Sequence, residues 1–179
     1  MKNSSTHQLE RLAKRLLMKH GVASPPVPLE TLAKQLGAEV RVASVNKALR
    51  GFFVAESGGV LKRNIIFVNA AHPRSAQRWT LAHELGHMLL ANREIHVDWP
   101  DSPNRRGESK SKVSDREEIL ADQLALELLL PKHMLSSDIE HPLDPHDDES
   151  LERLASRYQV SLYALISRLE QVRLLQSGH

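Results

Sequence analysis

The sequence predicts an α+β fold in which a small mixed or antiparallel sheet lies between helical segments. Three runs rich in Val, Ile and Phe are typical of strands and lie in the first half of the chain: residues 39–45, 51–57 and 65–70. Apolar residues at helical spacing precede and follow these runs. Of the 179 residues, 41% are apolar, which is enough for a core, and the length suits one domain or one domain with a small appendage.

Helices and turns are predicted along the rest of the chain. Apolar periodicity, ended by Gly or Pro, predicts helices over residues 6–20, 28–36, 73–91 and 114–130, and on both sides of a turn at 158–161. Residues 56–59 are typical of a turn between two strands, and the polar residues 98–112 of an exposed loop. Residues 138–150 have the composition of a linker. We therefore expect a main domain over residues 1–137, and a linker with a helical subdomain over residues 138–179.

The overall composition excludes several classes of protein. The 24 basic and 22 acidic residues nearly balance, so the net charge of +2 does not indicate a nucleic-acid coat or a membrane-surface protein. The absence of cysteine excludes disulfides, thiolate metal sites and cysteine nucleophiles. No signal core is found at the start, and no run approaches the roughly 20 apolar residues that cross a bilayer. We expect a soluble, cytoplasmic protein.

Residues 83–87 read His-Glu-Leu-Gly-His and lie inside a predicted helix. His83 and His87 are one helical turn apart, so both rings can reach one metal ion about 2 Å from each ligand nitrogen. Glu84 lies about 100° further around the helix, beside such a metal, where a carboxylate can take a proton from water. The pattern also arises by chance in ordinary helices. The apolar neighbours predict a buried helix, however, and buried histidines need a partner such as a metal.

Two further features of this helix bear on a metal site. Gly86 is costly in a helix interior, which indicates that another segment or a ligand comes close there. A catalytic zinc also needs a third protein ligand. One known pattern places a glycine three residues and a histidine six residues after His87, but Leu90 and Arg93 stand there, and His96 is too far along. A glutamate from a second helix remains as the third ligand.

The helix predicted after the polar loop offers two glutamates. Ser114 and Glu117 have the spacing of a capping box, which gives Glu117 a structural task and leaves Glu118 as the candidate ligand. Asp122 follows Glu118 by four residues on the same face, where it can accept a hydrogen bond from the outer N–H of a ligand histidine. The alternative is that Glu118 and Asp122 are both solvated surface acids.

Together these stretches resemble the ImmA/IrrE-type metallo-endopeptidases. The similarity runs in the same order through residues 27–40, 65–90 and 117–131, and covers nearly the whole chain. The combination of HExxH with Glu-x-x-Ala-Asp and Leu-Leu-Leu-Pro is more specific than HExxH alone. The resemblance implies a zincin-like (gluzincin) domain in which His83, His87 and Glu118 hold zinc and Glu84 is the general base. Asp122 stands where the family more often has asparagine.

The resemblance also implies a substrate class. Members of this family typically cleave helix-turn-helix repressors, often encoded beside the peptidase, and so relieve repression of stress, phage or mobile-element genes. We therefore expect a protein substrate of that kind and no membrane partner. Zinc is the expected metal, although manganese also suits two histidines and a glutamate.

Two parts of the site are less well defined by the sequence. Candidates for an additional oxyanion donor are His133, His72 and Tyr158, each of which is equally compatible with a surface or packing role. The strand before the active-site helix could be an edge strand that pairs with an extended substrate, through Ile65, Ile66, Phe67 and Val68. Four apolar residues in succession also suit a plain core strand.

The tail, residues 151–175, has the pattern of a helix-turn-helix and suggests a rival function. In that reading the protein is a DNA-binding regulator whose peptidase-like part is structural or sensory. The second tail helix carries Arg168 and Arg173 but few other groups for bases or phosphates, so we favour a packing or repressor-docking module. A purely structural zinc is a third reading, in which Glu84 would have no task.

Overall fold

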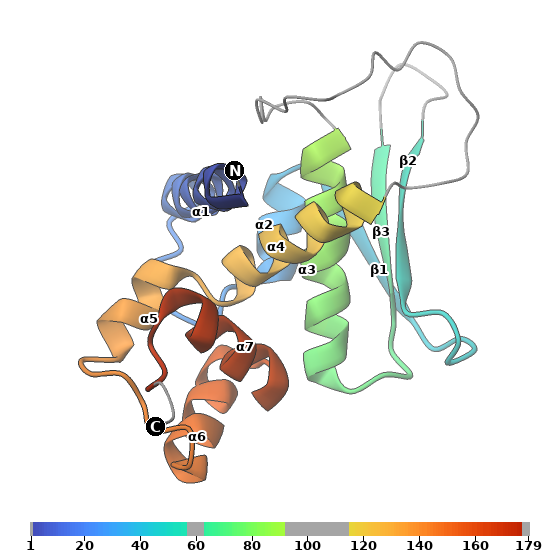
Figure 1. The fold of residues 1–179 in the computed structure, drawn as a ribbon. Coiled ribbons are helices and arrows are strands. Elements are labelled where there is room, and N and C mark those ends of the chain that lie inside the picture. Colours follow the sequence, from blue (N-terminus) through green and yellow to red (C-terminus); the bar gives the residue numbers. More distant parts are fainter. Residues whose placement is uncertain (1, 57–62, 92–114, 177–179) are drawn as a thin grey trace.

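The computed structural model describes residues 2–56, 63–91 and 115–176 (Figure 1). Its elements, in chain order, are α1 (Lys2–Lys19), α2 (Leu29–Gln35), β1 (Ala38–Ala43), β2 (Gly51–Glu56), β3 (Arg63–Asn69), α3 (Arg74–Ala91), α4 (Asp115–Leu129), α5 (Lys132–Asp138), α6 (Asp148–Tyr158) and α7 (Leu162–Val172). The predicted α+β class is confirmed. Residues 57–59 of the predicted turn, the predicted loop at 98–112, His96 and Ser114 lie outside the described residues.

The three strands form a mixed sheet in the order β1-β3-β2. β1 runs parallel to β3, with Val40 opposite Ile66, and β2 runs antiparallel to it, with Phe53 opposite the same residue. The prediction of an edge strand at Ile65, Ile66, Phe67 and Val68 is therefore wrong, because β3 is the central strand and both its sides are hydrogen-bonded. Among the described strands, β1 and β2 form the edges.

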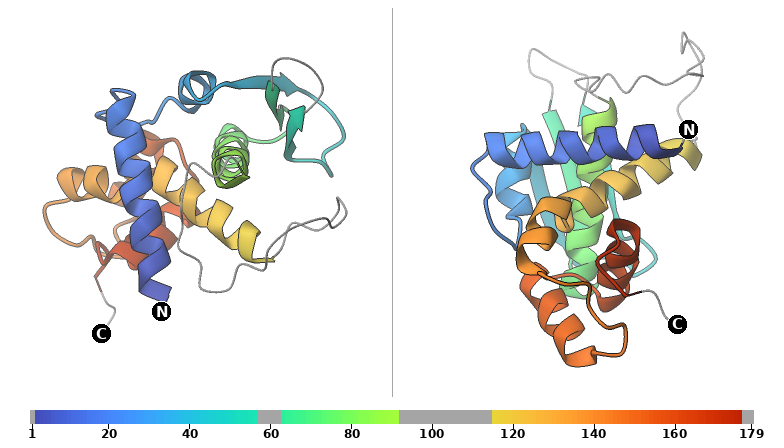
Figure 2. Two further views of the ribbon diagram at one scale, coloured as in Figure 1. Left: turned by 90° about the horizontal axis from the view of Figure 1, so that it is seen from above. Right: turned by 60° about the vertical axis from the view of Figure 1, so that its left-hand side comes forward.

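The helix α3 lies between the sheet and α4, as the view along its axis in Figure 2 shows. Apolar residues from all three layers fill this space and are nearly or fully buried: Ile66 and Val68 from β3, Leu81, Leu85 and Met88 from α3, and Leu124 and Leu128 from α4. The helix α1 packs across α4 through Leu9, Ala13 and Leu17. α3 is thus enclosed on two sides, and the buried helix predicted from its apolar neighbours is confirmed.

The C-terminal part consists of α6 and α7, which are separated by the predicted turn. Asp147 caps α6 by accepting from the Ser150 amide, and Ser161 caps α7 by accepting from the Ala164 amide. Between them, Gln159 takes the left-handed conformation with φ of 54°. Arg168 of α7 donates to the Leu130 carbonyl oxygen and pairs with Glu127 of α4, which ties the tail to the rest of the fold.

The segment predicted as a linker is partly structured. The short helix α5, which the sequence did not predict, ends at Asp138, and Leu143 forms a parallel bridge with Leu175. Among the described residues, no helix combines the length and the apolar character that crossing a membrane requires. The division at residues 137 and 138 stays a prediction.

Candidate metal centre

Two packed helices bring the three predicted ligands together. His83 and His87 project from α3 with their Nε2 atoms 2.9 Å apart. Glu118 of α4 places Oε2 at 3.3 Å from His83 Nε2 and Oε1 at 3.4 Å from His87 Nε2. One ligand atom from each residue lies within 4.8 Å of the others. His83, His87 and Glu118 therefore form a group that could hold a metal ion, and we call it the His-His-Glu cluster.

The distances within this cluster are close enough for a shared metal ion. Ligand atoms bound about 2.0–2.1 Å from a tetrahedral zinc lie roughly 3.3–3.4 Å from one another. Each histidine Nε2 lies at such a distance from one oxygen of Glu118, His83 at 3.3 Å from Oε2 and His87 at 3.4 Å from Oε1, while the two nitrogens are closer, at 2.9 Å. The histidine side chains are 18% and 17% exposed and that of Glu118 is 46% exposed, so the cluster is open to solvent on the Glu118 side.

Asp122 determines which nitrogen of His83 is available to a metal. Its Oδ1 atom lies 2.8 Å from His83 Nδ1. An ionised carboxylate only accepts hydrogen bonds, so Nδ1 carries the proton and donates it to Asp122. Neutral His83 therefore presents a lone pair at Nε2, the atom that faces His87 and Glu118. This is the arrangement predicted for Asp122, and it is the usual support for a ligand histidine.

Gly86 sets how closely the two helices approach. A Cβ added at residue 86 would lie 2.9 Å from the carbonyl oxygen and 3.0 Å from the Cα of Ala121 on α4. The prediction that another segment comes close at Gly86 is confirmed. Because Ala121 immediately precedes Asp122 and follows Glu118 by three residues, the same contact places both acids against the histidines.

Glu84 lies on the side of α3 that faces the sheet. The backbone N–H of Phe53 in β2 donates to its carboxylate. Burial raises the pKa of Glu84, as does the nearby Glu118, whereas His83 and the Phe53 amide lower it in part. Burial, and then the neighbouring His83, lower the pKa of His87, which favours the neutral ring that a metal requires.

The hydrogen bond from Phe53 also locates the edge of β2 that faces away from β3. The Asn69 amide of β3 donates to the Arg50 carbonyl, so residue 50 faces β3. Backbone groups of successive residues in an antiparallel strand point to opposite sides, so Gly51, Phe53 and Ala55 direct theirs away from β3. The carboxylate of Glu84 therefore lies at the outer edge of β2, which pairs with no strand among the described residues. This role of β2 could not be predicted, since nothing in the residue pattern gives the strand order.

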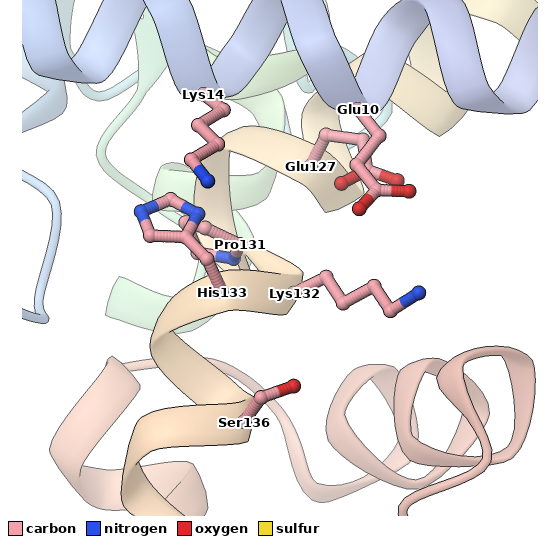
Figure 3. Close-up of a pocket in the computed structure, with 7 residues that line it drawn as sticks. All are labelled: Glu10, Lys14, Glu127, Pro131, Lys132, His133 and Ser136. Carbon is pink, nitrogen blue, oxygen red and sulfur yellow. The ribbon is translucent and has the colours of Figure 1, made fainter.

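The three candidate oxyanion donors make their contacts elsewhere. Tyr158 is fully buried and donates to Asp138 Oδ2 at 2.9 Å. His72 Nε2 lies 3.2 Å from the Leu49 carbonyl oxygen. His133 lines a small cavity of about 150 Å³ with Glu10, Lys14 and Lys132, between α1 and the α4–α5 junction (Figure 3). An oxyanion role for Tyr158, His72 or His133 stays a prediction that these contacts do not support.

Comparison with known proteins identifies the family of this α+β domain. The chain belongs to the family described as the IrrE N-terminal-like domain, Peptidase_M78, whose model matches residues 33–170. That range contains the whole His-His-Glu cluster, Glu84 and Asp122, and it confirms the resemblance drawn from the sequence. No curated protein sequence gives a match.

A solved structure shares the fold. The protein described as a Mycobacterium tuberculosis transcriptional regulator superimposes with a TM-score of 0.62 at 15% sequence identity. The similarity covers 92% of this chain and 46% of that one, so this chain spans about half the length of the solved protein. At this identity the likeness concerns the fold alone.

Proposed function

We propose that this protein is a zinc-dependent endopeptidase. The observation that carries the proposal is the His-His-Glu cluster, which two packed helices hold together. Asp122 contacts His83 at Nδ1, away from the metal side, and Glu84 lies beside the cluster toward β2. Three protein ligands leave a coordination position open, which is typical of catalytic rather than structural zinc sites. Membership of the Peptidase_M78 family supports the same reaction class.

In this proposal a side chain of the protein carries out the proton transfers, and a bound metal would act as a positively charged Lewis acid. A zinc ion at the cluster would provide a Lewis acid that polarises a peptide carbonyl and favours deprotonation of water. The carboxylate of Glu84 takes the proton from the attacking water and passes it to the nitrogen of the leaving amine. The Phe53 N–H holds that carboxylate at the edge of β2, close to where a backbone carbonyl of the substrate would lie.

An extended peptide would pair with the outer edge of β2, where no other strand of the described residues lies. The backbone groups of Gly51 and Ala55 and the carbonyl of Phe53 point there, while the Phe53 N–H is taken by Glu84. Strand addition of this kind gives affinity for any extended backbone, while side-chain pockets give selectivity. In this proposal β2 has the substrate-pairing role that the sequence predicted for residues 65–68.

The proposed substrate is a helix-turn-helix transcriptional repressor, cleaved in the cytoplasm to relieve repression of stress, phage or mobile-element genes. This finer statement rests on the family to which the chain belongs. Direct DNA binding by α7 is less well supported. Arg168, the arginine within α7, is 2% exposed and pairs with Glu127, so it is not available to a phosphate.

Cleavage of a repressor by matched proteins tests this function. Wild type and Glu84→Gln, both loaded with zinc, are incubated with the helix-turn-helix regulator encoded nearest the gene, and products are identified by mass spectrometry. We expect a defined internal cut with wild type and none with Glu84→Gln. If zinc-loaded wild type cuts neither this regulator nor unfolded casein, the peptidase proposal fails. Cutting of casein alone would reject only the repressor as substrate.

A further inference from the structure

Asn69, the last residue of β3, is fully buried and bonds only to backbone groups. Its amide oxygen accepts from the N–H of Val45 at 3.1 Å and from that of Ala71 at 2.9 Å. Its amide nitrogen donates to the carbonyl oxygens of Asn46 at 3.0 Å and Leu49 at 2.7 Å, and lies 3.4 Å from that of Val45. An asparagine side chain has two donors and an oxygen with two lone pairs, so the capacity of Asn69 is fully used.

These hydrogen bonds join two connections at one end of the sheet. In Figure 1 the β1–β2 loop, residues 44–50, and the connection from β3 to α3 both lie at the lower end of the sheet. The backbone N–H of Asn69 donates to the Arg50 carbonyl oxygen at 2.9 Å, and His72 Nε2 lies 3.2 Å from the carbonyl oxygen of Leu49. The start of β2 is therefore held against the connection that leads into α3.

The β1–β2 loop has little support from burial. All its residues are exposed, including the apolar Val45 and Leu49 at 41% and 39%. Two further hydrogen bonds run within the loop, from the backbone N–H groups of Ala48 and Leu49 to Asn46. These bonds shape the loop but do not place it. Its position relative to the rest of the fold therefore depends mainly on Asn69.

The position of this loop determines how β2 meets α3. A Cβ added at Gly51, the first residue of β2, would lie 2.4 Å from Cγ2 of Thr80 on α3. Two residues further along β2, the Phe53 N–H donates to Glu84, which follows Thr80 by four residues. Two residues advance about 6.4–6.8 Å along a strand, and four advance about 6 Å along a helix. β2 thus runs alongside α3 with matched spacing, starting from the residue that follows the loop.

We propose that Asn69 is a positioning residue for the peptidase reaction. It holds the β1–β2 loop so that the outer edge of β2, and a peptide paired with that edge, lies beside Glu84. This inference rests on the proposed peptidase function and adds a residue that acts through β2. A substrate bound by strand addition takes its position from the strand with which it pairs. Because a displacement of about 1 Å can cost 100-fold in rate, the placement of β2 matters to the reaction.

The amide of Asn69 is the group that this role requires. Aspartate has the same shape but an oxygen in place of the amide nitrogen, and that oxygen would face the carbonyl oxygens of Asn46 and Leu49. Alanine would remove every hydrogen bond of the side chain and leave the Val45 and Ala71 N–H groups without this partner. Both changes should release the loop, and aspartate does so without opening a cavity.

Asn69→Ala and Asn69→Asp test this role, with Asp147→Ala as the control. Asp147 accepts a hydrogen bond from a backbone N–H at the start of α6, so the control also loses a bond between a side chain and the backbone, but outside the sheet and α3. Each protein is loaded with zinc, and its zinc content and its kcat/KM for casein are measured. Hydrogen exchange followed by NMR gives the protection of the backbone amides of Phe53 and Leu85. Asn69→Asp keeps the test decisive if Asn69→Ala does not fold.

We expect both Asn69 variants to keep one zinc per chain, because the hydrogen bonds of Asn69 involve none of the metal ligands. Their kcat/KM should fall about 10- to 100-fold, and Phe53 should exchange at least tenfold faster than in wild type. Leu85 lies in the buried centre of α3, so its exchange follows the overall stability. A merely structural role would accelerate Leu85 while Phe53 and kcat/KM match the control, and that result would overturn the proposal.

The positioning role and the peptidase function fail in different ways. If zinc-loaded wild type leaves casein intact, the reaction is rejected and the positioning role in it is rejected as well. If wild type cuts casein and the Asn69 variants cut it as fast as Asp147→Ala, only the positioning role is rejected. Slower cleavage with unchanged exchange at Phe53 would also reject it, because Asn69 would then act without moving β2.

Discussion

Gly86 of α3 and Ala121 of α4 approach so closely that a Cβ on residue 86 would meet the Ala121 carbonyl oxygen at 2.9 Å. The atom in the way belongs to the backbone, so it cannot move aside as a flexible side chain could. The two helices that carry all the predicted ligands are therefore held at a separation that only glycine permits at residue 86.

Gly86→Ala should consequently weaken both the fold and the metal centre. Alanine gains about 1 kcal/mol over glycine in a helix, but overpacking in a core costs typically 1–3 kcal/mol. We expect a net loss of roughly 1 kcal/mol in the free energy of unfolding, measured by urea denaturation, and weaker zinc binding by competition with a chelator. Adding Ala121→Gly should not restore either property, because two of the three close contacts are with backbone atoms of residue 121. A Gly86→Ala protein that is more stable than wild type would contradict this packing.

Removal of the Asp122 carboxylate should weaken zinc binding without abolishing it. Asp122 holds His83 in the tautomer that presents Nε2, and loss of such a partner typically reduces metal affinity 10–100-fold. We expect Asp122→Ala to show a decrease in that range in a zinc competition assay, and Asp122→Asn a smaller one. Asp148→Ala, which removes an exposed carboxylate from α6, serves as the control. Equal affinity in Asp122→Ala and in the control would show that the His83 contact does not support metal binding.

Breaking the ion pair between Glu127 and Arg168 should strongly destabilise the protein. The two side chains are 4% and 3% exposed, and removal of one partner would leave the other charge buried. Such a loss typically costs 3–5 kcal/mol, so we expect about that reduction in unfolding free energy for Arg168→Met. The double variant Glu127→Leu, Arg168→Met should recover much of it, because no unpaired charge is left. A stable Arg168→Met with a weakened affinity for DNA would instead favour the DNA-binding reading of α7.

The contacts of Asp138 predict a loss of stability in acid. Burial opposes ionisation, but hydrogen bonds from Arg157 and Tyr158 outweigh it and leave the pKa of Asp138 below its ordinary value. A lowered folded-state pKa stabilises the fold above the unfolded pKa of about 3.9, and this contribution is lost as the pH falls through the folded value. The stability difference between wild type and Asp138→Asn should thus be constant from about pH 5 to 8 and shrink below about pH 4. Glu140→Gln makes the same charge change at an exposed site and is the control, so an equal pH trend in both variants would contradict a role for the Asp138 contacts.

The sequence predicts the residues of the site more completely than it predicts the fold around them. His83, Glu84, His87, Glu118 and Asp122 lie at spacings of one or four residues on helices, and helical periodicity alone determines which of them share a face. The structure brings His83, His87 and Glu118 together and places Asp122 on His83, as expected. The close approach at Gly86 could also be predicted, because a glycine is unfavourable in a helix interior unless a close contact there requires it.

The sheet could not be predicted to the same depth. Strand order depends on contacts between distant residues, and the apolar run at 65–68 is compatible with either a central or an edge strand. The role of the Phe53 amide follows from this order, so it was also missed. A cavity of about 320 Å³ lined by Trp79 of α3, Leu126 of α4 and Tyr163 of α7 could not be predicted either, because no spacing in the sequence relates these residues.

Zinc content in a set of single variants tests the central claim most directly. The test uses purified wild type, Glu84→Gln, Glu117→Ala and Glu118→Ala. Each protein is stripped of metal, reloaded with zinc and passed through a desalting column, and its zinc content per chain is then measured by elemental mass spectrometry. If His83, His87 and Glu118 hold the ion and Glu84 acts beside it, the first three proteins retain one zinc per chain and Glu118→Ala retains little or none. Wild type without zinc, or Glu118→Ala with a full equivalent while Glu117→Ala has lost it, would contradict the assignment of the metal centre.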